Sequence, residues 1–180
     1  RERVRARYGV DKPFILTVAS SLLKNPQGTA TAYSQLPREI QDRYDLVVVM
    51  AYPRFMDTMG ALAEQLGISG KVHVLLGLQP EELVLLYNLS EVLVYPSFTE
   101  SFPLPTAEAM ACGVPVVCSN NTGFPEQVGN AAIMVEPDDT DAIASALAKI
   151  LPDEALKARM RQASLQRSQL FSWQATARQT

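Results

Sequence analysis

The sequence of 180 residues is poor in the side chains on which many catalytic and metal-binding sites depend, because it contains one histidine and two cysteines. Cys112 and Cys118 lie in apolar segments, without the spaced cluster of a metal site or the cysteine density of a disulfide-rich secreted domain. We therefore expect both to be reduced, structural thiols. His73 lies between valines in a predicted strand, which makes it a poor catalytic candidate.

The sequence also lacks a long apolar run and an excess of positive charge. No run approaches the roughly 20 residues that cross a bilayer, and residues 1–5 lack the apolar stretch of a signal peptide. The formal net charge is −3, and the lysines and arginines are scattered rather than gathered into a basic stripe. We expect a soluble, cytoplasmic chain with no transmembrane segment and no nucleic-acid partner.

The length and composition predict one substantial core rather than two, since 47% of the residues are hydrophobic. The chain begins without a methionine and ends at Thr180 within a polar, helix-compatible stretch, which is typical of an excised fragment. We predict that residues 1–12 form a lead-in helix and connector from a missing N-terminal domain. Residues 13–180 then form the domain itself.

Short segments that are apolar at nearly every position alternate with mixed segments of helical spacing. Such apolar segments indicate strands covered on both faces. Helix-end signals are also present: Gly67 ends a helix over 55–66, while Asp138 or Asp139, and later Asp153, cap two others. The alternation predicts an α/β fold, a doubly wound, Rossmann-like parallel sheet of about six strands with helices on both faces and a ligand crevice beyond the carboxyl ends of the strands. The predicted strands span residues 14–20, 46–50, 71–76, 92–97, 115–120 and 131–137.

The most informative segment runs from Tyr95 to Val117 and comprises a strand, a polar loop, a short helix closed by Gly113, and the next strand. It places Glu100 on the loop and Glu108 in the helix, so both carboxylates can face one crevice. The N–H groups at a helix start bind phosphates. Carboxylates accept hydrogen bonds from sugar hydroxyls, worth roughly 1.5–3 kcal/mol each. The arrangement suits a diphosphate flanked by two polyhydroxylated rings.

This segment resembles the signature of the large retaining glycosyltransferase family with the two-Rossmann GT-B architecture (glycosyl transferases group 1), in its C-terminal, donor-binding domain. The resemblance implies that Glu100 contacts the transferred sugar and that Glu108 binds the ribose. It also implies that the loop amides after Glu100 hold the diphosphate, although Pro103 has no N–H to offer. These loop positions are Ser101, Phe102, Pro103 and Leu104.

Two other loops resemble parts of the same family's donor site. The stretch from Val18 to Ser20, with Lys24, resembles the first loop, which implies that Lys24 reaches the donor phosphates and that Ser20 is a donor-binding residue. Gly77 and Leu78 resemble the loop that packs on the nucleobase.

Two matches lie nearer the C-terminus. The turn over residues 123–126 resembles the family's glycine and proline-glutamate turn, and Phe171 with Trp173 resembles an aromatic pair near its C-terminus. We interpret these two aromatic side chains as core or interface residues rather than as stacking platforms.

The resemblance implies transfer of a hexose-type unit from a UDP- or GDP-sugar to an acceptor hydroxyl, with retention of anomeric configuration and without a further cofactor. Glu100 and Lys24 are then the catalytic residues. Polysaccharide or glycan synthesis is the typical setting, and the acceptor glycan or lipid-linked sugar binds the missing N-terminal domain. The chain alone is therefore expected to be inactive, and the full-length protein to lie peripherally at the inner membrane face.

Other interpretations share this architecture. A non-catalytic binding or scaffold module is favoured by Ala19 and Ser20, which stand where many family members have glycine and arginine, and by Pro103. A dinucleotide-dependent oxidoreductase has no support, since no Gly-x-Gly-x-x-Gly turn follows any predicted strand. Asp139 and Asp141 have a spacing that holds divalent metals, but a helix cap explains it more simply, so we predict no metal site.

Overall fold

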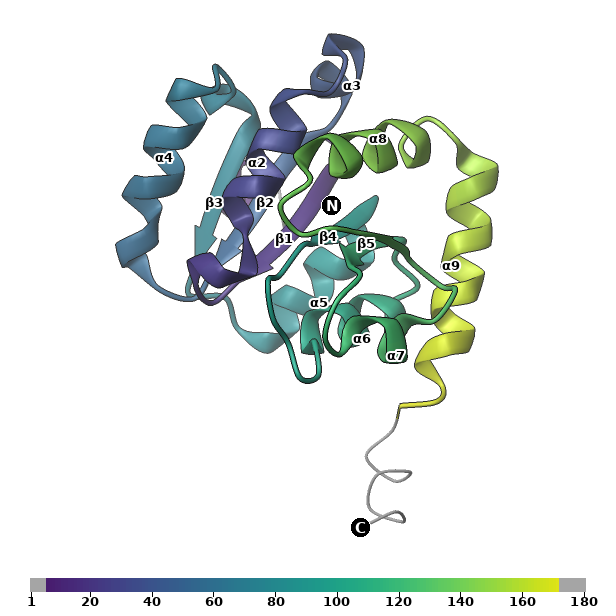
Figure 1. Cartoon of the computed structure of the whole chain (residues 1–180). Helices are drawn as coiled ribbons and strands as arrows, with labels where there is room; N and C mark the ends of the chain where they lie inside the picture. The colour runs from purple at the N-terminus through teal and green to yellow at the C-terminus, as the bar shows by residue number, and fades with distance from the viewer. Residues whose placement is uncertain (1–5, 172–180) are drawn as a thin grey trace.

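The computed structural model describes residues 6–171, in which six parallel strands form one sheet (Figure 1). The strand order is β3-β2-β1-β4-β5-β6, so the order reverses between β1 and β4. This confirms the predicted doubly wound α/β fold. The strands are β1 (Phe14–Ala19), β2 (Asp45–Met50), β3 (Val72–Leu76), β4 (Val92–Tyr95), β5 (Val116–Ser119) and β6 (Ile133–Val135).

Helices connect the strands and extend beyond the last one, and residues 6–8 are helical as well. In the part of the chain that is described, no helix combines the length and the apolarity that a bilayer-spanning segment needs. The α-helices are α2 (Pro26–Ser34), α3 (Arg38–Arg43), α4 (Met56–Gln65), α5 (Pro80–Leu89), α6 (Leu104–Ala111), α7 (Phe124–Val128), α8 (Thr140–Ile150) and α9 (Glu154–Ser168), and the 3₁₀ turns are η1 (Leu22–Lys24), η2 (Pro53–Phe55) and η3 (Ser69–Lys71).

The predicted helix ends are confirmed by their hydrogen bonds and backbone angles. Asp139 caps α8 by accepting from the N–H of Ala142 at 2.8 Å, and Asp153 caps α9 in the same way. Gly67 follows α4 with φ +69°, the left-handed conformation that glycine adopts without strain. Strands β2 and β3 end where predicted, whereas the other four end one or two residues earlier. Ser97 lies in the loop after β4, where its hydroxyl is within hydrogen-bond distance of the carbonyls of Leu23 and Thr99.

The sheet is buried on both faces because its strands are apolar at successive positions. In β2, Leu46 and Val48 pack into a cluster with α2, α4 and α8, while Val47 and Val49 pack into a second cluster with α5, α6 and α7. Burying each such side chain stabilises the fold by roughly 1.5–3 kcal/mol. Two helical layers are thus fixed on a sheet whose carboxyl edge stays open for loops.

Helix α9 is held to this core by polar as well as apolar contacts. It runs down the side of the molecule from α8 towards α7 (Figure 1). The side chain of Lys157 is only 3% exposed and lies 2.8 Å from Glu91 and 2.6 Å from Glu154. Burial alone would lower the pKa of Lys157, but its hydrogen bonds to Glu154 and Glu91 outweigh that effect and raise it. The lysine therefore stays charged and links α9 to the start of β4.

Replacing this lysine, Lys157→Met, should lower the free energy of unfolding by about 1–3 kcal/mol, because it removes the buried ammonium that lies 2.8 Å from the carboxylate of Glu91. Since the folded-state pKa of Lys157 is raised, the stabilisation is fully present below about pH 10 and disappears as the pH rises through the folded pKa. Urea unfolding of Lys157→Met and of the control Glu154→Gln measures this. A loss of equal size in the control, whose carboxylate is exposed, would contradict it.

A close approach between two loops also depends on glycine. The N–H of Gly123 donates to the carbonyl of Glu100 at 3.0 Å, so the loop after β5 lies against the loop after β4. A Cβ atom at this position would overlap the carbonyl oxygen of Ser101. The atoms that it would meet belong to the backbone, so the clash could not be relieved by turning a side chain.

We expect Gly123→Ala to lower the free energy of unfolding by about 1–3 kcal/mol, the usual cost of overpacking. Gly60→Ala is the matched control, because Gly60 lies within α4 and a Cβ there meets nothing within 4 Å. That control should instead stabilise the protein by roughly 0.5–1 kcal/mol. Denaturant unfolding of both variants tests the contrast, and similar values for the two would show that the loop contact is unimportant.

Candidate active site at the strand-order reversal

The site is built where β1 and β4 end side by side. Their connections leave in opposite directions, since β2 and β3 lie on one side and β5 and β6 on the other. Such a reversal leaves a crevice beyond the carboxyl ends of the strands, where ligands bind in open α/β sheets. Lys24 follows β1 and Glu100 follows β4, so both lie at this reversal.

Lys24 and Glu100 are in direct contact. The ammonium nitrogen of Lys24 lies 2.6 Å from Oε1 of Glu100, with the two side chains 19% and 14% exposed. The hydroxyl of Tyr95, the last residue of β4, donates to the same oxygen at 2.6 Å. A cation and a phenol therefore hold one carboxylate oxygen, and no described residue bonds the other.

The loop that carries Glu100 is fixed by backbone contacts on both sides. The N–H of Glu100 donates to Oγ1 of Thr122 at 3.1 Å, beside the glycine contact described above. On the other side, the N–H of Phe98 donates to the carbonyl of Leu23 at 3.0 Å, which ties this loop to the Lys24 turn. Fixed loops of this kind keep the carboxylate and the ammonium in place before any ligand arrives.

Glu108 projects from the second turn of α6 and has a phenol of its own. The hydroxyl of Tyr87 in α5 donates to Oε2 of Glu108 at 2.9 Å. Burial, then the charge and hydrogen bond of Glu108, raise the pKa of Tyr87. Burial, then the hydrogen bond and charge of Glu100 and the charge of Glu108, raise the pKa of Tyr95. The charges of both carboxylates thus act in the same direction on the pKa of Tyr95.

The start of α6 offers fewer phosphate donors than a helix without prolines would. Pro103 and Pro105 have no N–H, and the N–H of Thr106 already donates to the carbonyl of Pro103. Among residues 6–171, nothing bonds the remaining amides, those of Ser101, Phe102 and Leu104. The hydroxyl of Thr106 is buried and also lacks a partner within that range. The helix start therefore keeps three amides and its positive dipole end for an anion.

Three other predicted site residues lie at the same edge of the sheet but not in contact with Glu100. Ser20 is exposed directly after β1. Gly77 follows β3, an edge strand, and adopts φ +64°. Leu78 packs into the cluster beneath α5 and α6. Their predicted contacts with a donor stay predictions.

Other residues singled out in the sequence have structural partners. His73, in the edge strand β3, lies 3.1 Å from Asp45, and Asp141 accepts a hydrogen bond from Gln35 at 2.9 Å. Within the described range, no three histidine, cysteine, aspartate or glutamate side chains are grouped as a metal site. Both cysteines are free thiols; Cys118 is buried, and burial raises its pKa to about 12.

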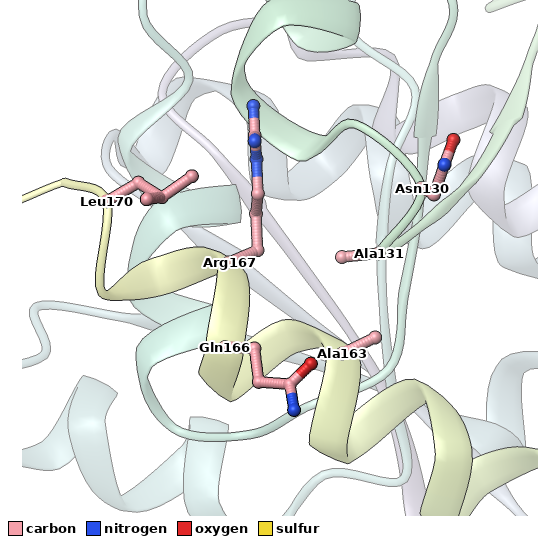
Figure 2. A pocket seen from close by; sticks show the side chains of 6 residues that line it. All are labelled: Asn130, Ala131, Ala163, Gln166, Arg167 and Leu170. Atoms are coloured by element: carbon pink, nitrogen blue, oxygen red, sulfur yellow. The ribbon is translucent and has the colours of Figure 1, made fainter.

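A shallow cavity of about 310 Å³ lies away from the paired carboxylates, between α9 and the turn before β6 (Figure 2). Arg167, one of its lining residues, donates to the carbonyls of Glu126 and Gln127 and lies over the ring of Phe171. The ring of Phe171 packs edge-on against the ring of Phe102, with 5.7 Å between the ring centroids, so it contacts the loop that carries Glu100. Trp173 lies outside the described residues. The cavity has no carboxylate and does not resemble the predicted donor site.

Sequence reasoning missed the supporting side chains of the site. Tyr87 and Tyr95 stand at apolar positions of a helix and a strand, where they resemble ordinary core residues. A buried phenol nearly always finds a hydrogen-bond partner, so each could have been flagged as a partner for a nearby carboxylate. Thr122 gave no signal in the sequence, because its role depends on β5 lying beside β4.

Comparisons with known proteins agree with this architecture. The chain is 36% identical over 179 residues to the serotype-specific mannosyltransferase WbdA of Escherichia coli. The matched region covers 98% of this chain and 22% of that protein. It is 38% identical over 157 residues to the O-antigen chain mannosyltransferase B of Escherichia coli, covering 87% of the chain and 41% of the relative. The chain thus spans less than half the length of either relative.

Among solved structures, the fold matches sucrose-phosphate synthase from Thermosynechococcus elongatus with a TM-score of 0.85 and 29% identity, over 99% of this chain and 47% of that one. The model of the family described as glycosyl transferases group 1 matches residues 1–167. The sheet order, the paired loops at its reversal and these matches lead to one conclusion: the chain belongs to the glycosyl transferases group 1 family.

Proposed function

We propose that this chain binds the donor of a glycosyltransferase, a nucleoside diphosphate sugar, and that the protein containing it transfers a hexose with retention of anomeric configuration. The observation that carries the proposal is the contact of Lys24 with Glu100 at the sheet reversal, beside the start of α6. A cation and a helix start can bind the diphosphate of such a donor, and a carboxylate can bind its sugar hydroxyls.

The proposed donor lies across the start of α6. The free amides of Ser101, Phe102 and Leu104 and the ammonium of Lys24 bind the diphosphate. Glu100 accepts hydrogen bonds from the sugar hydroxyls on one side, and Glu108 from the ribose on the other. Gly77 and Leu78 are proposed to flank the base, and Ser20 to lie near the phosphates.

Donor binding requires Lys24 to exchange partners. In the structure its ammonium forms an ion pair with Glu100. A diphosphate carries more negative charge than one carboxylate, so it competes for the ammonium while Tyr95 still holds Oε1 of Glu100. The exchange frees the carboxylate for the sugar and places the cation where charge develops as the bond from the sugar C1 atom to the diphosphate breaks.

Several observations support the finer parts of this proposal. Both named relatives are mannosyltransferases, which supports a hexose as the transferred unit. One of them acts on the O-antigen chain, which supports a glycan as acceptor. We propose that the acceptor binds the part of the protein that precedes this domain, and that the protein works in the cytoplasm at the inner membrane face. UDP and GDP are both candidate nucleotides.

Lys24→Ala in the full-length protein should lower kcat about 10²- to 10³-fold, the usual effect of removing one group that stabilises developing negative charge. Lys71→Ala is the control, since Lys71 forms a surface pair with Asp42. Initial rates with UDP- and GDP-hexoses measure the effect. Unchanged turnover of Lys24→Ala would refute its role.

Glu100→Gln separates an enzyme from a non-catalytic module. An enzyme should lose sugar transfer, because the amide oxygen is a weaker acceptor than the carboxylate, whereas a scaffold should keep its protein partner. Glu64→Gln, in α4, is the matched control. Calorimetric titration of the 180-residue chain with UDP, GDP and ADP completes the test. Absence of binding by all three would count against a competent donor site.

A further inference from the structure

Four tyrosines among the described residues are almost completely buried, and they divide into two pairs by the partner of their hydroxyl. Tyr33 donates to the carbonyl of Tyr44 at 2.8 Å, and Tyr44 donates to the carbonyl of Leu151 at 2.9 Å. Tyr87 and Tyr95, 1% and 2% exposed, donate instead to carboxylates. Those carboxylates are the two that flank the start of α6.

We propose that Tyr87 and Tyr95 are positioning residues, each of which fixes one carboxylate so that its second oxygen is presented to the donor. The inference rests on the proposed function and assigns to it two residues beyond the carboxylates, the lysine and the loop amides. Tyr95 acts through Glu100, and Tyr87 acts through Glu108.

The geometry gives each phenol this effect. Tyr95 bonds Oε1 of Glu100 and Tyr87 bonds Oε2 of Glu108, and in the described part of the chain no group bonds the second oxygen of either carboxylate. Both tyrosine residues are only 1–2% exposed, so separating a hydroxyl from its carboxylate leaves a largely buried donor without its hydrogen bond, which is costly. The phenol therefore selects the carboxylate rotamers in which its bond is made.

Fixing the carboxylates matters because glutamate is a flexible side chain. Ordering a free glutamate when the ligand binds removes rotamer freedom, which weakens binding. Glu108 shows the need most clearly, since it is an exposed residue on a helix surface and accepts a hydrogen bond from Tyr87. Burial and the neighbouring carboxylates raise the pKa of both phenols, so they stay protonated donors throughout the neutral range.

The two phenols should have separable effects, because their carboxylates face different parts of the donor. Tyr87, through Glu108, should govern affinity for the ribose. Tyr95, through Glu100, should govern the reacting sugar, where contacts strengthen in the transition state. A purely structural role in the core would not distinguish these two ends of the ligand.

The ribose test compares Tyr87→Phe with the unchanged 180-residue chain by calorimetry. The probes are whichever of UDP and GDP binds more tightly, and its 2′,3′-dideoxy counterpart. The unchanged chain should prefer the ribonucleotide, and Tyr87→Phe should bind that nucleotide about tenfold more weakly while binding the dideoxy form as before. Equal weakening for both nucleotides, or no weakening, would overturn the role of Tyr87.

The sugar test uses the full-length protein. Tyr95→Phe should lower kcat about tenfold with little change in the donor KM. Glu100→Gln should then cost less in the Tyr95→Phe background than it does alone, because both changes disturb one interaction. Additive effects of the two substitutions, or a change confined to KM, would overturn the role of Tyr95.

Tyr33→Phe and Tyr44→Phe are the matched controls, since they remove a buried hydroxyl from the same kind of core without touching a carboxylate. Both should lower the unfolding midpoint in urea, yet keep the ribose preference and kcat. If the unchanged chain binds no nucleotide, the proposed function itself fails. If it binds with a ribose preference that Tyr87→Phe retains, only the positioning role fails.

Discussion

Two neighbouring parallel strands, β1 and β4, end at the same level, and the chain leaves them in opposite directions. No connecting helix can cover the space directly beyond both strand ends, so two loops meet there. One loop carries Lys24 and the other carries Glu100. Their side chains form an ion pair, with 2.6 Å between Nζ of Lys24 and Oε1 of Glu100. The loop after β5 supports the pair through Thr122 and Gly123. The position of the site is thus a consequence of strand order.

The site is anchored in the apolar core rather than resting on its surface. Tyr95 ends a fully buried strand, and Tyr87 lies on the core face of α5. Both phenols therefore contact the carboxylates from the side of the apolar core. This arrangement places a polar network at the boundary of the core, where each hydrogen bond is strengthened by low dielectric and an unmade one is costly. Rigidity of the core is thereby transmitted to charged groups that face solvent.

Family membership and local geometry contribute different parts of the functional argument. The match to glycosyl transferases group 1 supplies the reaction class, whereas the geometry of the site indicates which groups of this chain are placed to act. The prolines at 103 and 105 reduce the number of amides at the start of α6, so the proposed donor site depends more strongly on Lys24 for phosphate binding. In the proposed donor site, the ion pair between Lys24 and Glu100 is the state from which Lys24 exchanges partners with the diphosphate.

The sequence by itself determined the fold class, the strands and the caps at Asp139 and Asp153, because these depend on periodicity and local hydrogen bonds within a few residues. It also identified Lys24, Glu100 and Glu108 as candidates, through a resemblance to a known family. Only the tertiary structure decided which side chains support them: Thr122, Tyr87 and Tyr95 meet the site through strand order and helix packing. The physical reason is that a buried phenol contributes the same apolar pattern to a sequence whether its hydroxyl meets a carbonyl or a carboxylate, and only long-range packing selects the partner.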